Sequence, residues 1–278
     1  MNVGIVGLGL IGGSMAKSAK ARTDHTVFAC DIDQETMTMA RLSGAMDAPL
    51  TDETLPRCDL VLVAVRPGAA VEWVKAHGDK IAKSAILVDL CGVKRKVVQE
   101  LTPLAEKYGF SYIGGHPMAG KERGGFVNST DSLYVGASMI LTPDQHTDMQ
   151  LLETLKAFFL DLGFAQLTFS TPEEHDRIIA YTSQLAHVTS SAYVKSPSAQ
   201  RRRGFSAGSF NDMTRVARLD EDMWTELFLD DDDFLVEELE FFIASLNEYL
   251  HALKSRDKAR LRALLKAGRE RKTDAGGN

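Results

Sequence analysis

The sequence predicts an α/β protein in which a doubly wound, mainly parallel sheet is followed by an all-α segment. Apolar strand patterns alternate with helical patterns up to about Ser170, and this alternation is typical of parallel sheets covered by helices on both faces. From Pro172 onward the strand pattern stops and only helical spacing remains. The change predicts two domains, residues 1–170 and residues 171–278.

Composition and charge exclude several classes of partner. Hydrophobic residues make up 44% and charged residues 25% of the 278 residues, which is ordinary for a globular protein. The net charge of -6 argues against a general nucleic-acid binder. No apolar run is long enough to span a bilayer and no signal peptide is evident, so we expect a cytoplasmic protein. The three cysteines lack paired spacing, which predicts neither disulfides nor a metal site.

A strand over residues 3–6 runs directly into a glycine-rich turn and a helix. Gly7 permits a tight turn, Gly9 lets the backbone approach a pyrophosphate, and Gly12 lets the helix pack closely on its strand. Free N–H groups at the start of that helix would bind the anion. This is the Rossmann-type arrangement, and we assign six consecutive residues to cofactor binding: Gly7, Leu8, Gly9, Leu10, Ile11 and Gly12.

An acidic residue, Asp31, closes the second strand at residues 26–30. Its carboxylate can accept both hydroxyls of a ribose, whereas a 2′-phosphate beside it would be repelled by on the order of 1–4 kcal/mol. No arginine follows closely, since residues 32–35 are neutral or acidic. NAD is therefore the expected cofactor, in preference to NADP. The alternative is a structural glycine turn with an Asp that caps a helix.

The remaining elements of the sheet domain place further residues at strand ends. Strands are predicted at residues 59–65, 85–89, 111–113, 137–141 and 165–169. Helices are predicted at 35–43, through Lys75, after residues 91–94 to about Lys107, and at about 147–162. Ligands lie beyond the carboxyl ends of parallel strands, where Gly7, Asp31, Arg66, residues 91–94 and His116 all fall. We expect them around one crevice, with Arg66 and Gly92 beside the cofactor.

His116 stands after two glycines and before Pro117. The glycines allow a ligand to approach the backbone, and Pro117 favours an extended His116. An imidazole at a strand end can act as an acid or a base near neutral pH, so we assign His116 to catalysis. The alternative is a histidine that only hydrogen-bonds a loop.

The helical segment offers a histidine and an arginine. On a helix at residues 172–193, His187 shares a face of small and polar residues with Ser183 and Gln184, and could look into a cleft or into solvent. Arg215 follows Asn211 or Asp212 as the expected cap of a helix at 211–219, and its guanidinium could grip a carboxylate or simply be solvated. Further helices are predicted at 223–229, 234–254 and 258–269.

Lys94 lies where a helix begins, although a cation there opposes the helix dipole. A nearby anion would explain it.

Five stretches together resemble the prephenate dehydrogenases of tyrosine biosynthesis, which are related to arogenate dehydrogenases. They are residues 7–14, residues 114–122, Glu174-His175-Asp176, the segment that ends in His187, and residues 211–215 with Met223-Trp224. The run Gly-His-Pro-Met-Ala-Gly at 115–120 with its preceding glycine is the specific part, because many dehydrogenases share the dinucleotide turn. The resemblance covers the chain to its last helix.

The resemblance implies a nucleotide-binding domain followed by a helical domain that dimerises. It implies that His116 hydrogen-bonds the ring hydroxyl of prephenate, that Arg215 holds a carboxylate, and that His187 lines the pocket. The expected reaction transfers a hydride to NAD while His116 takes the hydroxyl proton, and loss of carbon dioxide yields 4-hydroxyphenylpyruvate. Many members have a serine where this chain has Gly92, so a water or the Gly92 backbone would supply that hydrogen bond.

Two alternative functions stay open at this point. Arogenate could replace prephenate as the substrate, and a regulatory protein could bind NAD without turnover. We rank the regulator low because it would not need both His116 and Arg215.

A seam of apolar residues at alternating spacings of four and three suits either core packing or a homodimer through the C-terminal helices: Leu235, Leu239, Phe242, Leu246, Tyr249 and Leu253.

Overall fold

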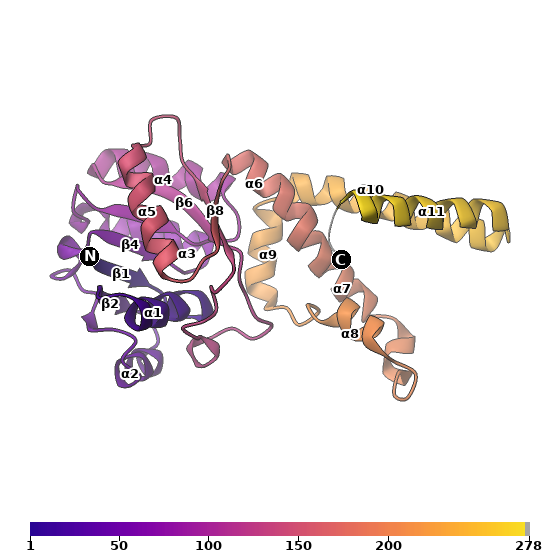
Figure 1. Ribbon diagram of the computed structural model, residues 1–278, viewed down its shortest axis with the longest axis horizontal. Coiled ribbons are helices and arrows are strands. Elements are labelled where there is room, and N and C mark those ends of the chain that lie inside the picture. The colour runs from indigo at the N-terminus through magenta and orange to yellow at the C-terminus, as the bar shows by residue number, and fades with distance from the viewer. Residues whose placement is uncertain (276–278) are drawn as a thin grey trace. The chain divides into compact units, whose positions relative to one another are not determined.

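A computed structural model describes residues 1–275 and contains one eight-stranded sheet with the order β3-β2-β1-β4-β5-β6-β7-β8 (Figure 1). Strands β6 and β7 are antiparallel, whereas all other neighbours are parallel. The sheet confirms the predicted doubly wound fold. Its strands are β1 (Asn2–Val6), β2 (Thr26–Cys30), β3 (Ala48–Pro49), β4 (Leu60–Val63), β5 (Ile86–Asp89), β6 (Ser111–Pro117), β7 (Ser138–Thr142) and β8 (Gln166–Phe169).

Helices connect the strands and then continue alone, as the sequence predicts. Those of the sheet region are α1 (Leu10–Arg22), α2 (Gln34–Leu42), α3 (Pro67–His77), α4 (Arg95–Tyr108) and α5 (Met149–Asp161). Those after the sheet are α6 (Pro172–Ile179), a π-helical segment (Ala180–Gln184), α7 (Leu185–Tyr193), α8 (Gly208–Thr214), α9 (Glu221–Leu229), α10 (Asp232–Lys254) and α11 (Lys258–Asp274). No helix within residues 1–275 is long and apolar enough to cross a membrane.

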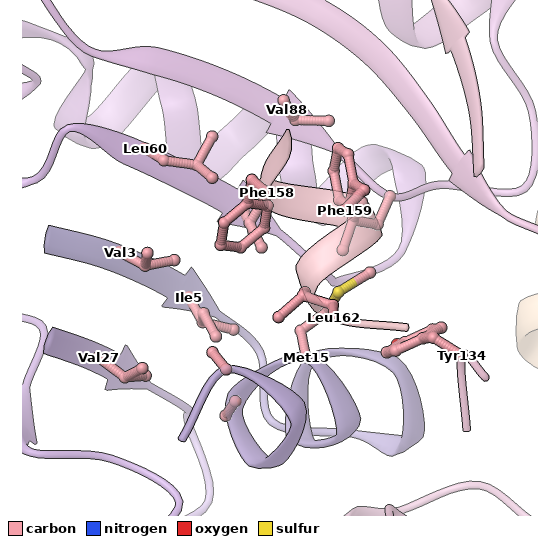
Figure 2. Packing of buried hydrophobic residues seen from close by; sticks show 14 of the residues in the cluster. Val3, Ile5, Met15, Val27, Leu60, Val88, Tyr134, Phe158, Phe159 and Leu162 are labelled. Carbon is pink, nitrogen blue, oxygen red and sulfur yellow. The ribbon is translucent and has the colours of Figure 1, made fainter. Parts of the chain in front are cut away.

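Two hydrophobic cores cover the two faces of the sheet. Side chains alternate along each strand, so in β1 Val3 and Ile5 enter one core and Val6 the other. The first core includes Met15 of α1 and the Phe158–Phe159 pair of α5 (Figure 2). The second core includes buried residues of α3 and α4. Helices on both faces leave the strand ends as the place where polar side chains can gather.

The chain divides into two compact units, Met1–Asp231 and a second unit that begins at Asp232. The first unit contains the sheet and helices α1 to α9, and the second contains α10 and α11. In the second unit Tyr249 of α10 donates a hydrogen bond to the carbonyl of Leu264 in α11. The domain boundary expected after residue 170 stays a prediction.

Several element boundaries differ from the sequence analysis. Strand β6 continues through His116 because residues 114–117 pair with β7, so His116 lies within the strand. Helix α8 begins at Gly208 with Ala207 as its cap, and the expected cap at Asn211 or Asp212 is wrong. The ring of Phe210, in the first turn of α8, contacts Tyr193 and Arg202. Helix α11 extends to Asp274.

The glycine turn between β1 and α1 depends on missing side chains at two positions. Gly7 has φ +84°, a left-handed conformation that favours glycine. A Cβ atom on Gly12 would lie 1.9 Å from the Gly7 carbonyl oxygen, so the helix could not pack where it does. A Cβ atom on Gly9 would have no neighbour within 4 Å. Neighbouring atoms therefore leave no space for a side chain at Gly7 and Gly12, whereas the space beside Gly9 is free.

We expect Gly12→Ala and Gly9→Ala to differ sharply in stability. The methyl group at residue 12 collides with backbone, so Gly12→Ala should lower the free energy of unfolding by about 1–3 kcal/mol. Gly9→Ala meets open space and should change it by no more than about 0.5 kcal/mol. Urea denaturation of both variants measures the difference, and equal losses would contradict the packing role of Gly12.

Candidate active site

The carboxyl ends of β1 and β2 bring the glycine turn and Asp31 together, as expected. Asp31 Oδ2 accepts a hydrogen bond from the Leu8 backbone N–H at 2.7 Å, and its Oδ1 accepts one from Asp33 N–H at 2.9 Å. Asp31 thus anchors the turn to the end of β2. The open side of Gly9 and the uncapped N–H groups that start α1 leave room and donors for a phosphate ligand. This region fits a dinucleotide.

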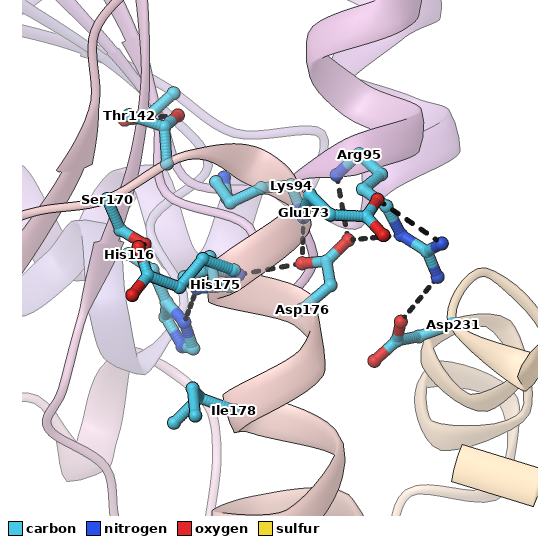
Figure 3. Close-up of polar contacts among 12 residues, drawn as sticks. Lys94, Arg95, His116, Thr142, Ser170, Glu173, His175, Asp176, Ile178 and Asp231 are labelled. Carbon is cyan, nitrogen blue, oxygen red and sulfur yellow. Dashed lines mark hydrogen bonds and ion pairs between the residues drawn. The ribbon is translucent and has the colours of Figure 1, made fainter. Parts of the chain in front are cut away.

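His116 lies near the carboxyl end of β6, where its half-buried ring faces a second histidine. The distance from His116 Nδ1 to His175 Nε2 is 2.9 Å (Figure 3). Loss of contact with water, followed by the neighbouring His175 and the Lys94 cation, holds the pKa of His116 well below its usual range. The ring is therefore neutral at pH 7 and can accept a proton.

Gly92 lies beside His116 at the end of β5. A Cβ atom on Gly92 would lie 4.0 Å from His116 Nε2 and 3.5 Å from a methyl group of Leu227. These are ordinary contacts, so the position has room for a small side chain. Of the residues predicted from the sequence, the structure brings Gly92 and His116 into one group.

A buried carboxylate, Asp176, supports the histidine pair. Asp176 lies on α6, and its Oδ1 is 2.7 Å from His175 Nδ1. The same carboxylate accepts the backbone N–H groups of Lys94 at 2.7 Å and Arg95 at 2.8 Å, where α4 begins. Figure 3 shows His116, His175, Asp176 and the start of α4 joined in one chain of hydrogen bonds. Neither Asp176 nor the His175 side chain is exposed to solvent.

The anion that the sequence analysis sought for Lys94 is Asp89. Lys94 caps α4, and its fully buried ammonium pairs with Asp89 at the end of β5. Tyr112 donates a hydrogen bond to the second carboxylate oxygen of Asp89 at 2.8 Å. Burial and the Asp89 charge raise the pKa of Tyr112 well above its usual range. The Lys94 charge is thus balanced inside the protein and needs no bound anion.

His187 forms a second group with Trp224 and Arg215. Its ring stacks on Trp224 of α9 with centroids 3.8 Å apart, and its Nδ1 donates to the Ser183 carbonyl at 2.8 Å. Burial, and then the Arg215 charge, lower the pKa of His187, while the bond to Ser183 acts in the opposite direction. His187 is therefore neutral at pH 7, with Nε2 as its bare nitrogen.

Gln184 ends the π-helical segment that precedes His187 by one turn. It is 2% exposed, and within residues 1–275 neither its amide nitrogen nor its amide oxygen has a hydrogen-bond partner. An unpaired buried amide costs free energy, and π-helical turns are frequent at functional sites. The amide of Gln184 therefore provides one hydrogen-bond donor and one acceptor that a ligand could use.

Arg215 and Arg66 both form ion pairs with side chains of the same chain. Arg215, at the end of α8, is 3.1 Å from Glu122, which lies on the loop after His116. Both side chains are substantially exposed, so this pair can exchange partners. Arg66 caps α3 and is 3.1 Å from Asp220. The structure places Arg66 against the start of α9, and its predicted cofactor contact stays a prediction.

Helix α9 connects the two histidine groups. Trp224 stacks on His187, and Leu227, one turn later, contacts the space above Gly92. The helix is held by Glu226, whose carboxylate accepts the Gly68 N–H at 2.6 Å. Helix α9 thereby contacts the neighbourhoods of both Gly92 and His187.

Sequence reasoning assigned no role to His175, Asp176, Gln184 or Trp224. Glu174-His175-Asp176 was recognised only as part of a family resemblance. Its signal was a run of three titratable residues in the first turns of the helix that follows the last strand. Many helices begin with polar residues of this kind, so the run does not by itself indicate a site. The arrangement can remove a proton from a ligand at His116 and bind a carboxylate at Arg215.

Comparison with protein families identifies both halves of the chain. Residues 15–167 match the model described as prephenate dehydrogenase, nucleotide-binding domain. Residues 171–267 match the model described as prephenate dehydrogenase, dimerization domain.

Individual relatives agree with the family models. A cyclohexadienyl dehydrogenase of Zymomonas mobilis is 30% identical over 265 residues, which cover 92% of this chain and 89% of that protein. A prephenate dehydrogenase of Bacillus subtilis is 28% identical over 96% of this chain and 74% of its own length. The crystal structure of Aquifex aeolicus prephenate dehydrogenase with hydroxyphenyl propionate and NAD+ superposes with a TM-score of 0.84 at 28% identity, and covers 99% of this chain and 98% of that one.

Proposed function

The chain belongs to the prephenate dehydrogenase family, and we propose that it catalyses the NAD-dependent oxidative decarboxylation of prephenate to 4-hydroxyphenylpyruvate. The observation that carries this proposal is the neutral His116 imidazole beside Gly92, at the strand ends where the nucleotide-binding half meets α6. The relatives named prephenate dehydrogenase support the choice of substrate.

The cofactor is NAD. The open face at Gly9 and the N-terminus of α1 suit the pyrophosphate, and Asp31 suits the ribose hydroxyls. When bound, NAD supplies the acceptor for the hydride. Because the Asp31 carboxylate stands at the end of β2, it disfavours the 2′-phosphate of NADP by charge repulsion.

We assign the chemistry to residues from both halves of the chain. His116 takes the proton of the ring hydroxyl, and its lowered pKa keeps the accepting form present at neutral pH. Arg215 holds a carboxylate of the substrate, for which it exchanges Glu122 as its partner. His187 lines the side-chain end of the site, held against Trp224.

Loss of the ring carboxylate as carbon dioxide makes the product ring aromatic and supplies the driving force. The protein therefore needs to position the substrate and to provide one base.

Use of arogenate as a second substrate is favoured by Gln184. Arogenate carries an ammonium where prephenate has a keto group. We place the amide of Gln184, one turn before His187, at that end of the substrate. This buried amide, without a hydrogen-bond partner within residues 1–275, holds both a carbonyl acceptor, suited to an ammonium, and an N–H donor, suited to a keto oxygen. The similarity to a cyclohexadienyl dehydrogenase is consistent with this second activity.

We also propose that the active protein is a homodimer through its C-terminal helices. The family model over residues 171–267 describes a dimerization domain. Several large apolar side chains of α10 are exposed in the single chain, among them Phe241 at 73%, Leu246 at 51% and Leu253 at 59%. Two of these belong to the predicted apolar seam, so packing within the chain does not use the whole seam.

A paired-substrate assay tests the proposed function. Purified protein should reduce NAD with prephenate, with a kcat/KM at least ten times that with NADP.

His116→Asn should lower kcat about 100-fold or more because the base is lost. Arg215→Ala should chiefly raise KM, since the carboxylate loses its partner. If NAD binds but neither prephenate nor arogenate is oxidised, the protein is a non-catalytic binder and the proposal is wrong.

Gly92→Ser should add a hydrogen bond to the substrate hydroxyl. The structure has room for the side chain, and one added bond corresponds to a KM for prephenate lower by roughly 2–10-fold. Gly92→Ala is the matched control because it adds the Cβ atom without the hydroxyl. Steady-state kinetics of the two variants measure the difference, and an equal effect on KM would contradict this use of residue 92.

Light scattering at micromolar concentration should give a mass of twice the 30.5 kDa of one chain. Leu246→Glu should shift that mass toward one chain because it places a charge in the apolar seam. Leu42→Glu, on the exposed face of α2, is the control and should leave the mass unchanged. A single-chain mass for the unaltered protein would refute the dimer.

A further inference from the structure

The chain of hydrogen bonds behind His116 determines which of its nitrogens carries hydrogen. A carboxylate oxygen can only accept hydrogen bonds, so His175 Nδ1, 2.7 Å from Asp176 Oδ1, must carry its hydrogen. Burial lowers the pKa of His175, against the opposing effect of Asp176, so the ring is neutral at pH 7 and its Nε2 is bare. His175 Nε2 is therefore the acceptor in its contact with His116.

The same reasoning applies one step further along. His116 Nδ1 lies 2.9 Å from the bare Nε2 of His175, so His116 Nδ1 must be the donor. In a neutral His116 the remaining nitrogen, Nε2, then carries the lone pair. This nitrogen is the one that lies 4.0 Å from the Cβ position of residue 92. The lone pair is thus on the nitrogen nearer to residue 92, the side on which the proposed function places the substrate hydroxyl.

We infer that His175, oriented by Asp176, is a positioning residue that fixes His116 in the tautomer with Nε2 as the base. The inference rests on the proposed role of His116 in the reaction. When Nε2 takes the hydroxyl proton, the positive ring keeps its Nδ1–H bond to His175, which the Asp176 charge polarises. Without His175 the ring can turn over or adopt the other tautomer, and its Nε2 is then no longer held as an acceptor.

Two substitutions of His175 distinguish the effect of losing its hydrogen-bond acceptor from the effect of losing the volume of its ring. His175→Phe fills the space but cannot accept from His116, so kcat should fall about 100-fold or more while KM changes little. His175→Gln keeps an acceptor oxygen for His116 and should retain kcat within about tenfold of the unaltered protein. His146→Phe, in an exposed turn after β7, is the control and should leave kcat unchanged. Urea denaturation establishes that each variant folds.

Nitrogen-15 NMR of the histidine rings tests the tautomer without relying on turnover. In the unaltered protein His116 should show a protonated Nδ1 and a bare Nε2, and in His175→Phe this signal should change to a mixture of tautomers. A protonated Nε2 in the unaltered protein, or full kcat in His175→Phe, would overturn the inference. Full turnover in His116→Asn would instead refute the proposed base and leave the tautomer measurement valid.

Discussion

The buried carboxylate of Asp176 is the interaction on which the arrangement of the site depends. It accepts two backbone N–H groups at the start of α4, where a helix has donors without internal partners and a partial positive charge. It also orients His175. One group therefore attaches α6 to the sheet half of the protein and sets the direction of the hydrogen bonds that reach His116. The same carboxylate thus both packs α6 against the start of α4 and orients the histidines that lead to His116.

The Lys94–Asp89 pair makes a second buried arrangement of charge close to the same place. Breaking such a pair costs about 3–5 kcal/mol, because the remaining charge stays buried without a partner. Tyr112 adds a hydrogen bond to Asp89 and completes the group. The Lys94 cation also lowers the pKa of His116, so a member of this buried pair favours the neutral imidazole. The charge of Lys94, which Asp89 balances at the end of β5, therefore also affects the pKa of His116.

The sequence predicted the parts of the fold that local rules determine. The glycine turn, the acid after β2 and the alternation of strands and helices along the chain follow from backbone conformation and apolar periodicity. The extension of β6 through His116 did not follow, because it depends on pairing with β7, which is distant in the sequence. The hydrogen bonds of Asp176 and the burial of the Gln184 amide could not be predicted either, because they depend on elements that are distant in the sequence. Helical spacing places Gln184 on a polar face of its helix but does not show which helix lies opposite.

Acidic side chains on α6, on α9 and at the cap of α9 attach these helices to the carboxyl edge of the sheet. Glu226 of α9 binds the N-terminus of α3, as Asp176 of α6 binds that of α4. Asp220 caps α9 by accepting the Met223 N–H and also pairs with Arg66. In each case a carboxylate meets the positive end of a helix, or the arginine that caps it, at the carboxyl edge of the sheet. Because that edge is also where the cofactor and substrate must bind, the contacts that hold α6 and α9 in place put Trp224 and the histidines there as well.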